Sequence, residues 1–196
     1  MDRYIEISGA ESKLVALSDL HHKYVEDYDA LASIVEGYKS RRYRVSVTIG
    51  TFDALHIGHL RYLTNARKQG DILVVGVDTD EVVKRSKGDL RPIIPFTERT
   101  EMLSYQSCVD LITPLEDIDE QGNWKYGLLR ALRPNVFVAE ETSYSQAQLD
   151  DIRKLCDEVV VLPRQAQGTS STLIVQNLVR KNLEKMLEDV NQRPKQ

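Results

Sequence analysis

The sequence has little of what marks disulfide-rich, metal-binding or membrane-spanning proteins. Its 196 residues contain 2 cysteines, and no apolar run approaches the roughly 18 residues that a membrane span requires. Cys108 and Cys156 lie far apart and have no histidine neighbours, so we expect two reduced thiols rather than a zinc site. The N-terminus lacks the apolar core of a signal peptide. We therefore expect a soluble, cytoplasmic protein without a membrane partner.

An excess of positive charge is missing as well. The 26 Lys and Arg residues against 30 Asp and Glu residues give a formal net charge of -4. A protein of this balance has no overall basic surface for nucleic acid, so we expect no nucleic-acid partner. Any phosphate chemistry must come from a local site.

From residue 45 onwards, short β-branched runs alternate with helical patterns. Short apolar runs of this kind are typical of the buried strands of a parallel sheet. The alternation predicts a doubly wound, Rossmann-like α/β fold with a parallel five-stranded sheet, in which ligands bind at the carboxyl ends of the strands. The predicted strands are Val45–Gly50, Ile72–Val77, Val109–Ile112, Val136–Ala139 and Val159–Leu162, and the predicted helices span 57–69, 79–86, 97–107, 125–132, 145–156 and 171–189.

The two ends of the chain differ from this α/β part. Over 11–39, apolar residues recur at spacings of three and four, which predicts an amphipathic helix or helix pair. We expect it to pack on the domain or on a second subunit, and the alternative is an arm that docks a partner or steers phosphates. The predicted division is a helical N-terminal extension over 1–43, the main domain over 44–190 and a flexible tail over 191–196.

The stretch from Gly50 to His59 is the most informative motif. It lies where the first predicted strand hands over to the first helix. His56 and His59 are three residues apart, so they face one pocket at the positive end of the helix dipole, and Gly58 leaves room for a phosphate or a base beside the backbone. No third metal ligand is evident, so we predict no protein metal site. The residues predicted to contact the nucleotide here are Gly50, Thr51, Phe52, Asp53 and Gly58.

On the turn Gly50-Thr51-Phe52-Asp53 and the pattern His56-x-Gly58-His59, the sequence resembles the cytidylyltransferase-like nucleotidyltransferases, from about Val45 to about Leu178. Class I aminoacyl-tRNA synthetases carry the same histidine pattern on far longer chains. The resemblance implies transfer of a nucleotidyl group from CTP or ATP to a small phosphorylated acceptor. It also implies Mg²⁺ bound mainly through the triphosphate, and a homodimer.

A basic block follows the second predicted strand. It includes Lys84, Lys87 and Arg91, with Arg99 early in the next helix. The run Lys87-Gly88-Asp89-Leu90-Arg91-Pro92 is similar to one in heptose-phosphate adenylyltransferases. That likeness implies that Lys84 or Lys87 binds the acceptor phosphate or the triphosphate, that Arg91 binds the acceptor, and that Arg99 anchors near the phosphates. The alternative is a solvated loop. The predicted catalytic residues are His56, His59, Lys87 and Arg99.

A third block opens the last predicted helix. Ser170, Ser171 and Thr172 follow Pro163-Arg164 at a short distance. Serine and threonine are good helix caps, and a helix N-terminus also binds phosphates. The resemblance, here to the glycerol-phosphate cytidylyltransferase branch, implies that these three residues and Arg164 hold the triphosphate.

The sequence departs from both branches after the fourth predicted strand. Where they carry a Gly-Gly-Asp or Gly-Asp element, this chain has Glu140 and Glu141. We predict that Glu140 contacts a hydroxyl or ammonium group of the acceptor, with a solvated helix cap as the alternative. Asp78 is also predicted to contact the acceptor, and the alternatives for it are a ribose hydroxyl, a magnesium-bound water or a turn. The mixed motifs favour CTP narrowly over ATP. A non-catalytic nucleotide sensor and an RNA-directed relative of the synthetases are the competing functional hypotheses.

Overall fold

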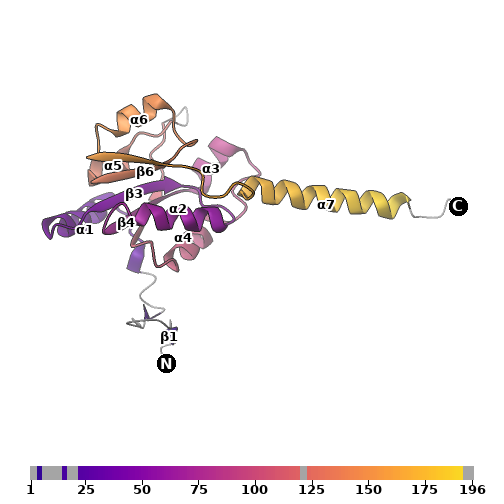
Figure 1. Cartoon of the computed structure of the whole chain (residues 1–196), viewed down its shortest axis with the longest axis horizontal. Coiled ribbons are helices and arrows are strands. Elements are labelled where there is room, and N and C mark those ends of the chain that lie inside the picture. The colour runs from indigo at the N-terminus through magenta and orange to yellow at the C-terminus, as the bar shows by residue number, and fades with distance from the viewer. Residues whose placement is uncertain (1–3, 6–14, 17–21, 120–122, 192–196) are drawn as a thin grey trace.

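The computed structural model describes residues 4–5, 15–16, 22–119 and 123–191 (Figure 1). A short antiparallel pair, β1 and β2, precedes a domain in which strands and helices alternate. None of the described helices is long and apolar enough to cross a membrane. The elements are β1 (Tyr4–Ile5), β2 (Val15–Ala16), α1 (Tyr28–Ser40), β3 (Val45–Gly50), α2 (Ile57–Arg67), β4 (Ile72–Asp78), α3 (Asp80–Lys87), α4 (Phe96–Ser104), β5 (Leu111–Leu115), α5 (Gly127–Leu132), β6 (Val136–Glu140), α6 (Gln146–Ile152), β7 (Glu158–Leu162) and α7 (Ser171–Asn191).

The five strands from β3 to β7 form one parallel sheet in the order β5-β4-β3-β6-β7. This arrangement confirms the predicted doubly wound α/β fold. The chain moves outwards from β3 through β4 to β5 and then returns to place β6 on the other side of β3. In open α/β sheets, a crevice for ligands forms at such a switch point, outside the carboxyl ends of the strands.

Helices cover both faces of the sheet (Figure 1). One face packs against α1, α5 and α6 in a core that includes Leu31, Leu129 and Ile152. The other face packs against α2 and α4 in a core that includes Leu63 and Leu103. Because both faces are covered, most strands are rich in apolar residues on both sides. The central strand β3 is an exception, since it also buries the hydroxyls of Ser46 and Thr48, which donate to the carbonyls of Ile72 and Val138. The two thiols are free and half-buried.

The N-terminal segment differs from the helix predicted over 11–39. Helix α1 begins at Tyr28, where Asp27 caps it by accepting a hydrogen bond from the amide of Ala30 at 2.7 Å. Before the cap, residues 22–23 form a 3-10 turn, Tyr24 makes a parallel bridge to Ile112, and the amide of Val25 donates to the carbonyl of Ile112 at 2.8 Å. Val15 also lies in a strand. Apolar residues therefore recur at spacings of three and four also in segments that are not helical. Within the predicted extension, residues 1–3, 6–14 and 17–21 lie outside the described residues, as do residues 192–196 of the predicted tail.

Truncating the core residue Leu31 tests whether α1 belongs to the folding unit. Leu31 is 0% exposed between α1 and the sheet, so Leu31→Ala should lower the free energy of unfolding by about 2–5 kcal/mol. Ile34→Ala is the matched control, because Ile34 lies on the same helix but is 39% exposed, and its cost should stay below about 1 kcal/mol. Urea denaturation measures both. Equal, small losses would show that α1 is not part of the core.

Candidate active site

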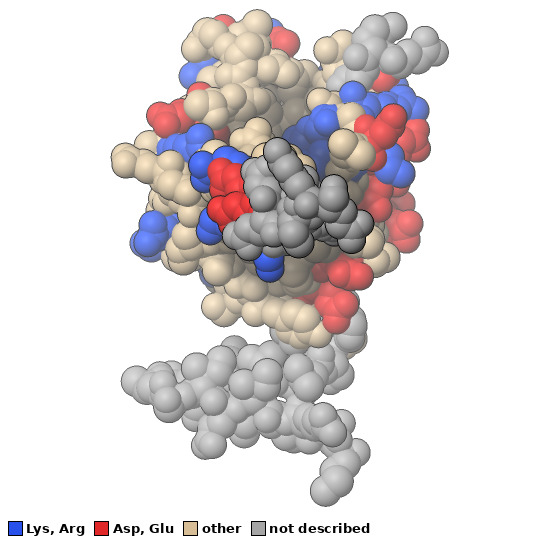
Figure 2. Space-filling view, turned by 90° about the vertical axis from the view of Figure 1, so that its right-hand side faces the viewer, with Lys and Arg blue, Asp and Glu red and all other residues tan. Residues whose placement is uncertain are grey.

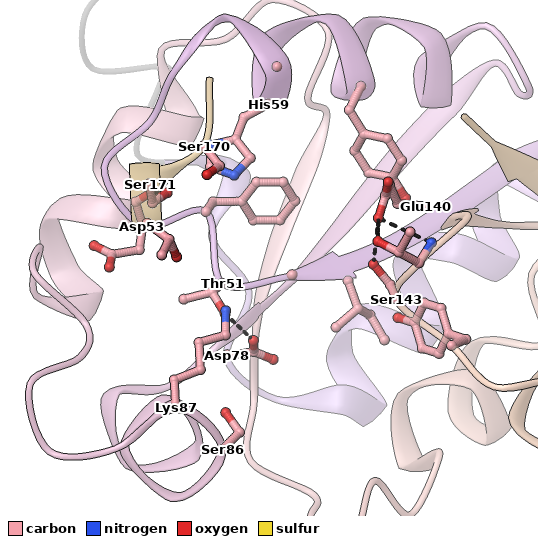
Figure 3. Close-up of a pocket in the computed structure, with 18 of the residues that line it drawn as sticks. Thr51, Asp53, His59, Asp78, Ser86, Lys87, Glu140, Ser143, Ser170 and Ser171 are labelled. Atoms are coloured by element: carbon pink, nitrogen blue, oxygen red, sulfur yellow. Dashed lines mark hydrogen bonds between the residues drawn. The ribbon is translucent and has the colours of Figure 1, made fainter. Parts of the chain in front are cut away.

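A cavity of about 770 Å³ opens at the carboxyl ends of the strands. Most of the residues singled out by sequence line it, although they come from segments far apart in the chain (Figure 3). Lys84 and Arg99 are the exceptions. The predicted residues that line the cavity are Gly50, Thr51, Phe52, Asp53, His56, Gly58, His59, Asp78, Lys87, Arg91, Glu140, Arg164, Ser170, Ser171 and Thr172.

His56 and His59 form a stacked pair at the N-terminus of α2. Their ring centroids are 3.9 Å apart, with an angle of 20° between the ring planes. His56 is the N-cap residue, and its Nδ1 accepts a hydrogen bond from the amide of Gly58 at 3.1 Å. A neutral His56 therefore carries its proton on Nε2. A Cβ on residue 58 would lie 2.9 Å from Cε1 of His56, so any larger residue would force the His56 ring to shift.

Burial keeps both imidazoles neutral near pH 7. Burial, together with the smaller effects of the neighbouring His56 and Lys87, lowers the pKa of His59 to about 4. Burial, followed by the charge of Arg164, also lowers the pKa of His56. Nδ1 of His59 is buried and has no hydrogen-bond partner in the described part of the chain. The pair therefore offers neutral donors and an unused nitrogen to a ligand.

Lys87 is held in the cavity by a chain of hydrogen bonds across two strand ends. Its Nζ donates to Oγ1 of Thr51 at 2.8 Å, and Oγ1 of Thr51 donates to Oδ2 of Asp78 at 2.7 Å (Figure 3). Burial of the ammonium lowers the pKa of Lys87, and the carboxylate of Asp78 opposes this shift. Burial raises the pKa of Asp78. Lys87 thus places a positive charge at the cavity wall.

The carboxylate of Asp53 joins three segments of the site. It is 5% exposed and accepts hydrogen bonds from the amides of Ile93 and Ile94 and from Nη1 of Arg91, the last at 2.7 Å. Arg91 also donates to Oγ1 of Thr172 at 3.1 Å. These contacts fix the basic loop against the β3–α2 turn and the start of α7.

The structure places Arg99 and Lys84 away from the cavity, unlike the sequence prediction of direct phosphate contact. Arg99 is 0% exposed and donates to the carbonyls of Thr51, Ile94 and Asp78 at 2.5, 3.0 and 2.8 Å. A guanidinium has five N–H donors, and a further one is taken by Asp80. Arg99 is therefore a positioning residue behind the cavity wall, whereas Lys84 is exposed on α3.

The start of α7 faces the histidine pair. Oγ of Ser170 accepts a hydrogen bond from the amide of Leu173 at 3.1 Å, which caps the helix, and the hydroxyl of Ser171 donates to the carbonyl of Asp53. Capping leaves other first-turn amides available to an anion. Acidic and basic side chains are interspersed over the face seen along α7 (Figure 2), so the positive character of the site is local.

Sequence reasoning missed several residues that line the cavity. Tyr62 lies three residues after His59, and this spacing places both on one face of α2. Tyr144 and Trp124 close another side, and Nε1 of Trp124 donates to Oδ1 of Asp117 at 3.1 Å. The spacing could have revealed Tyr62. No local pattern pointed to Trp124, because its loop follows β5 without a recognisable motif.

Comparisons with known proteins agree with this geometry. The chain is 40% identical over 114 residues to the bifunctional protein HldE of Geotalea uraniireducens, which covers 58% of this chain and 22% of that protein. The HldE protein of Hydrogenovibrio crunogenus is 45% identical over 111 residues, covering 56% of this chain and 22% of the relative. The match thus spans less than a quarter of these curated relatives.

Among solved structures, a lipopolysaccharide core biosynthesis protein of Thermoplasma volcanium is similar with a TM-score of 0.53 and 25% identity, over 63% of this chain and 99% of that one. The pantoate-β-alanine ligase of Francisella tularensis shares the fold, with a TM-score of 0.55 and 16% identity over 74% and 67% of the two chains. The sequence model described as cytidylyltransferase-like matches residues 47–177, which include nearly all of the sheet, the histidine pair and the start of α7. The chain therefore belongs to the cytidylyltransferase-like family.

Proposed function

We propose that the chain is a nucleotidyltransferase that joins a nucleoside monophosphate to the phosphate of a small acceptor and releases pyrophosphate. The observation that carries this proposal is the stacked, neutral pair of His56 and His59, which faces the start of α7 across a cavity that also holds Lys87. Neutral N–H donors, a helix N-terminus and one cation are groups that bind a triphosphate.

In the proposed reaction, an oxygen of the acceptor phosphate attacks the α-phosphorus in line, and the bond from that phosphorus to the bridging oxygen breaks. The acceptor phosphate is already anionic near pH 7, so no strong general base is needed. The histidine pair would donate to the oxygens on which negative charge develops, and Lys87 would hold the phosphates in place.

Magnesium would enter as part of the nucleotide substrate. Among the described residues, no group of three or more His, Cys, Asp or Glu side chains could hold a metal ion. Magnesium usually keeps several water ligands and binds through substrate phosphates with one or two carboxylates. Asp78, at the cavity wall, is a carboxylate that could contact its water shell.

For the nucleotide we propose ATP, and for the acceptor a sugar 1-phosphate of the heptose type. The run from Lys87 to Pro92 supports this choice, because it resembles heptose-phosphate adenylyltransferases and is fixed at the cavity by Arg91 and Asp53. The identities of 40% and 45% to proteins named HldE favour the same branch. CTP, narrowly preferred from the sequence, becomes the second candidate on the basis of the Gly50–Asp53 turn and Pro163-Arg164. The homodimer stays a prediction.

A substrate grid tests the proposal. Pyrophosphate release is measured with Mg²⁺ and each of ATP, CTP, GTP and UTP, against heptose and hexose 1-phosphates, glycerol 3-phosphate, phosphocholine and phosphoethanolamine. We expect turnover with ATP and a sugar 1-phosphate. Turnover only with CTP and glycerol 3-phosphate would select the second candidate. A grid without any turnover, from protein that binds nucleotide, would contradict the enzyme and favour the sensor.

His59→Ala is the catalytic test within that grid. Losing one preorganised donor to a developing charge typically lowers the rate about 10²–10³-fold, and we expect a loss of this size in kcat with little change in melting temperature. His22→Ala is the matched control, because His22 is exposed and does not line the cavity. An active His59→Ala enzyme would contradict the assigned role.

The low pKa of His59 predicts a specific loss of stability in acid. The unfolded chain binds a proton near pH 6.5, whereas folded His59 binds one only near pH 4. Stability therefore falls as the pH drops from 6.5 towards 4, and integration gives up to about 2 kcal/mol between pH 7 and pH 5. Urea denaturation at both pH values should show a smaller acid loss for His59→Gln than for the wild type. Equal losses would show that His59 titrates normally.

A further inference from the structure

The carboxylate of Glu140 lines the cavity with one oxygen held and the other unused. Glu140 ends β6. Its Oε2 accepts hydrogen bonds from Oγ1 of Thr142 at 2.7 Å and from Oγ of Ser143 at 3.2 Å (Figure 3). Oε1 is buried and has no partner within the described residues. The side chain is thus fixed in orientation while one acceptor remains open.

An unused buried acceptor is unfavourable until a donor reaches it. The neighbouring glutamate does not share this state, because Glu141 is exposed and its carboxylate accepts from the amide of Arg164 at 3.0 Å. This hydrogen bond joins Glu141 to the loop after β7. Glu140 lines the cavity and Glu141 does not, so Glu140 is the glutamate that can meet a bound molecule.

The charge of Glu140 disfavours phosphate groups on its side of the cavity, because no ion pair to Glu140 forms among the described residues, whereas Asp53 on the other side is paired with Arg91. Lys87, Thr51, Asp53 and His59 lie together on one side, and Glu140 lies on the other with Ser143 (Figure 3). Two anions repel at close range. A substrate whose phosphates occupy the side of Lys87 and His59 must therefore present its uncharged part to Glu140.

The position of β6 in the sheet indicates which of the two substrates contacts Glu140. β6 lies between β3, which leads into the histidine pair, and β7, which leads into the start of α7. Tyr62, one turn after His59, continues the cavity wall. Under the proposed function the triphosphate lies at the histidines and α7, so its nucleoside occupies this half. The ends of β4 and β5 remain for the acceptor.

We propose that Glu140 is a specificity-determining residue for the nucleoside, and that its Oε1 accepts a hydrogen bond from an N–H or O–H group there. The donor is either the exocyclic amino group of the base or a ribose hydroxyl. ATP and CTP carry an amino group where ITP and UTP carry a keto oxygen, which a carboxylate repels. This inference rests on the proposed function, and it replaces the acceptor-binding role predicted for Glu140 from the sequence.

The test is calorimetric binding of ATP, ITP, CTP, UTP and the 2′-deoxy and 3′-deoxy forms of ATP to the wild type and to Glu140→Gln. We expect the variant to bind the preferred nucleotide about tenfold to a hundredfold more weakly, as for a lost hydrogen bond to a charged group. If the base supplies the donor, the wild type prefers ATP over ITP and CTP over UTP, and the glutamine amide reduces or reverses that preference. If the ribose supplies it, one deoxy form binds weakly to the wild type and Glu140→Gln no longer distinguishes it.

Two controls separate recognition of the nucleoside by Glu140 from a general effect of the substitution on ligand binding. Glu36→Gln is the matched variant, because Glu36 is exposed on α1 outside the cavity, and it should bind every nucleotide as the wild type does. Tripolyphosphate, which has no nucleoside, should bind equally to the wild type and Glu140→Gln. Unchanged nucleotide binding in Glu140→Gln, an equal loss of tripolyphosphate binding, or an effect confined to the acceptor KM would overturn the inference. Absence of pyrophosphate release would contradict the proposed function separately, because binding is measured without turnover.

Discussion

The site depends on the buried carboxylate of Asp53. Its hydrogen bonds to the amides of Ile93 and Ile94 and to Arg91 hold the basic loop beside the histidine turn, and its backbone carbonyl accepts from Ser171 at the start of α7. Three segments far apart in the sequence meet at this residue. A buried carboxylate is tolerated because charged and backbone donors satisfy it, and the same donors fix the geometry of the cavity.

The second organising feature is the separation of charge across the cavity. Lys87 and the start of α7 lie on the side suited to phosphates, and the open oxygen of Glu140 lies on the other. A nucleoside triphosphate is itself divided in this way, with a polyanionic end and an end rich in neutral donors. Under the proposed function, the site is complementary to such a ligand in charge. Excluding water from the cavity would strengthen the electrostatic interactions on both of its sides, because charges are screened less in a desolvated pocket.

The resemblance in sequence correctly placed the chain in its family, and the apolar runs correctly predicted the five-stranded sheet. The runs succeeded because a strand covered on both faces is mostly apolar, although β3 also buries the polar residues Ser46 and Thr48. The same approach failed before Asp27, since apolar spacing of three and four continues through Val25, whose amide instead joins the edge of β5. Helix periodicity cannot detect that the N-cap lies at Asp27 or that an edge strand offers a competing partner.

The sequence by itself determined the local chemistry of the site: the cap at His56, the close packing over Gly58 and the hydroxyls that open α7. These depend on residues within one turn of each other, so their spacing fixes their relation. Only the tertiary structure decided that Arg99 lies behind the wall, that His59 is buried enough to lower its pKa to about 4, and that Glu140 rather than Glu141 faces the cavity. Burial and hydrogen-bond partners depend on segments brought together across the sheet, and no local pattern encodes them.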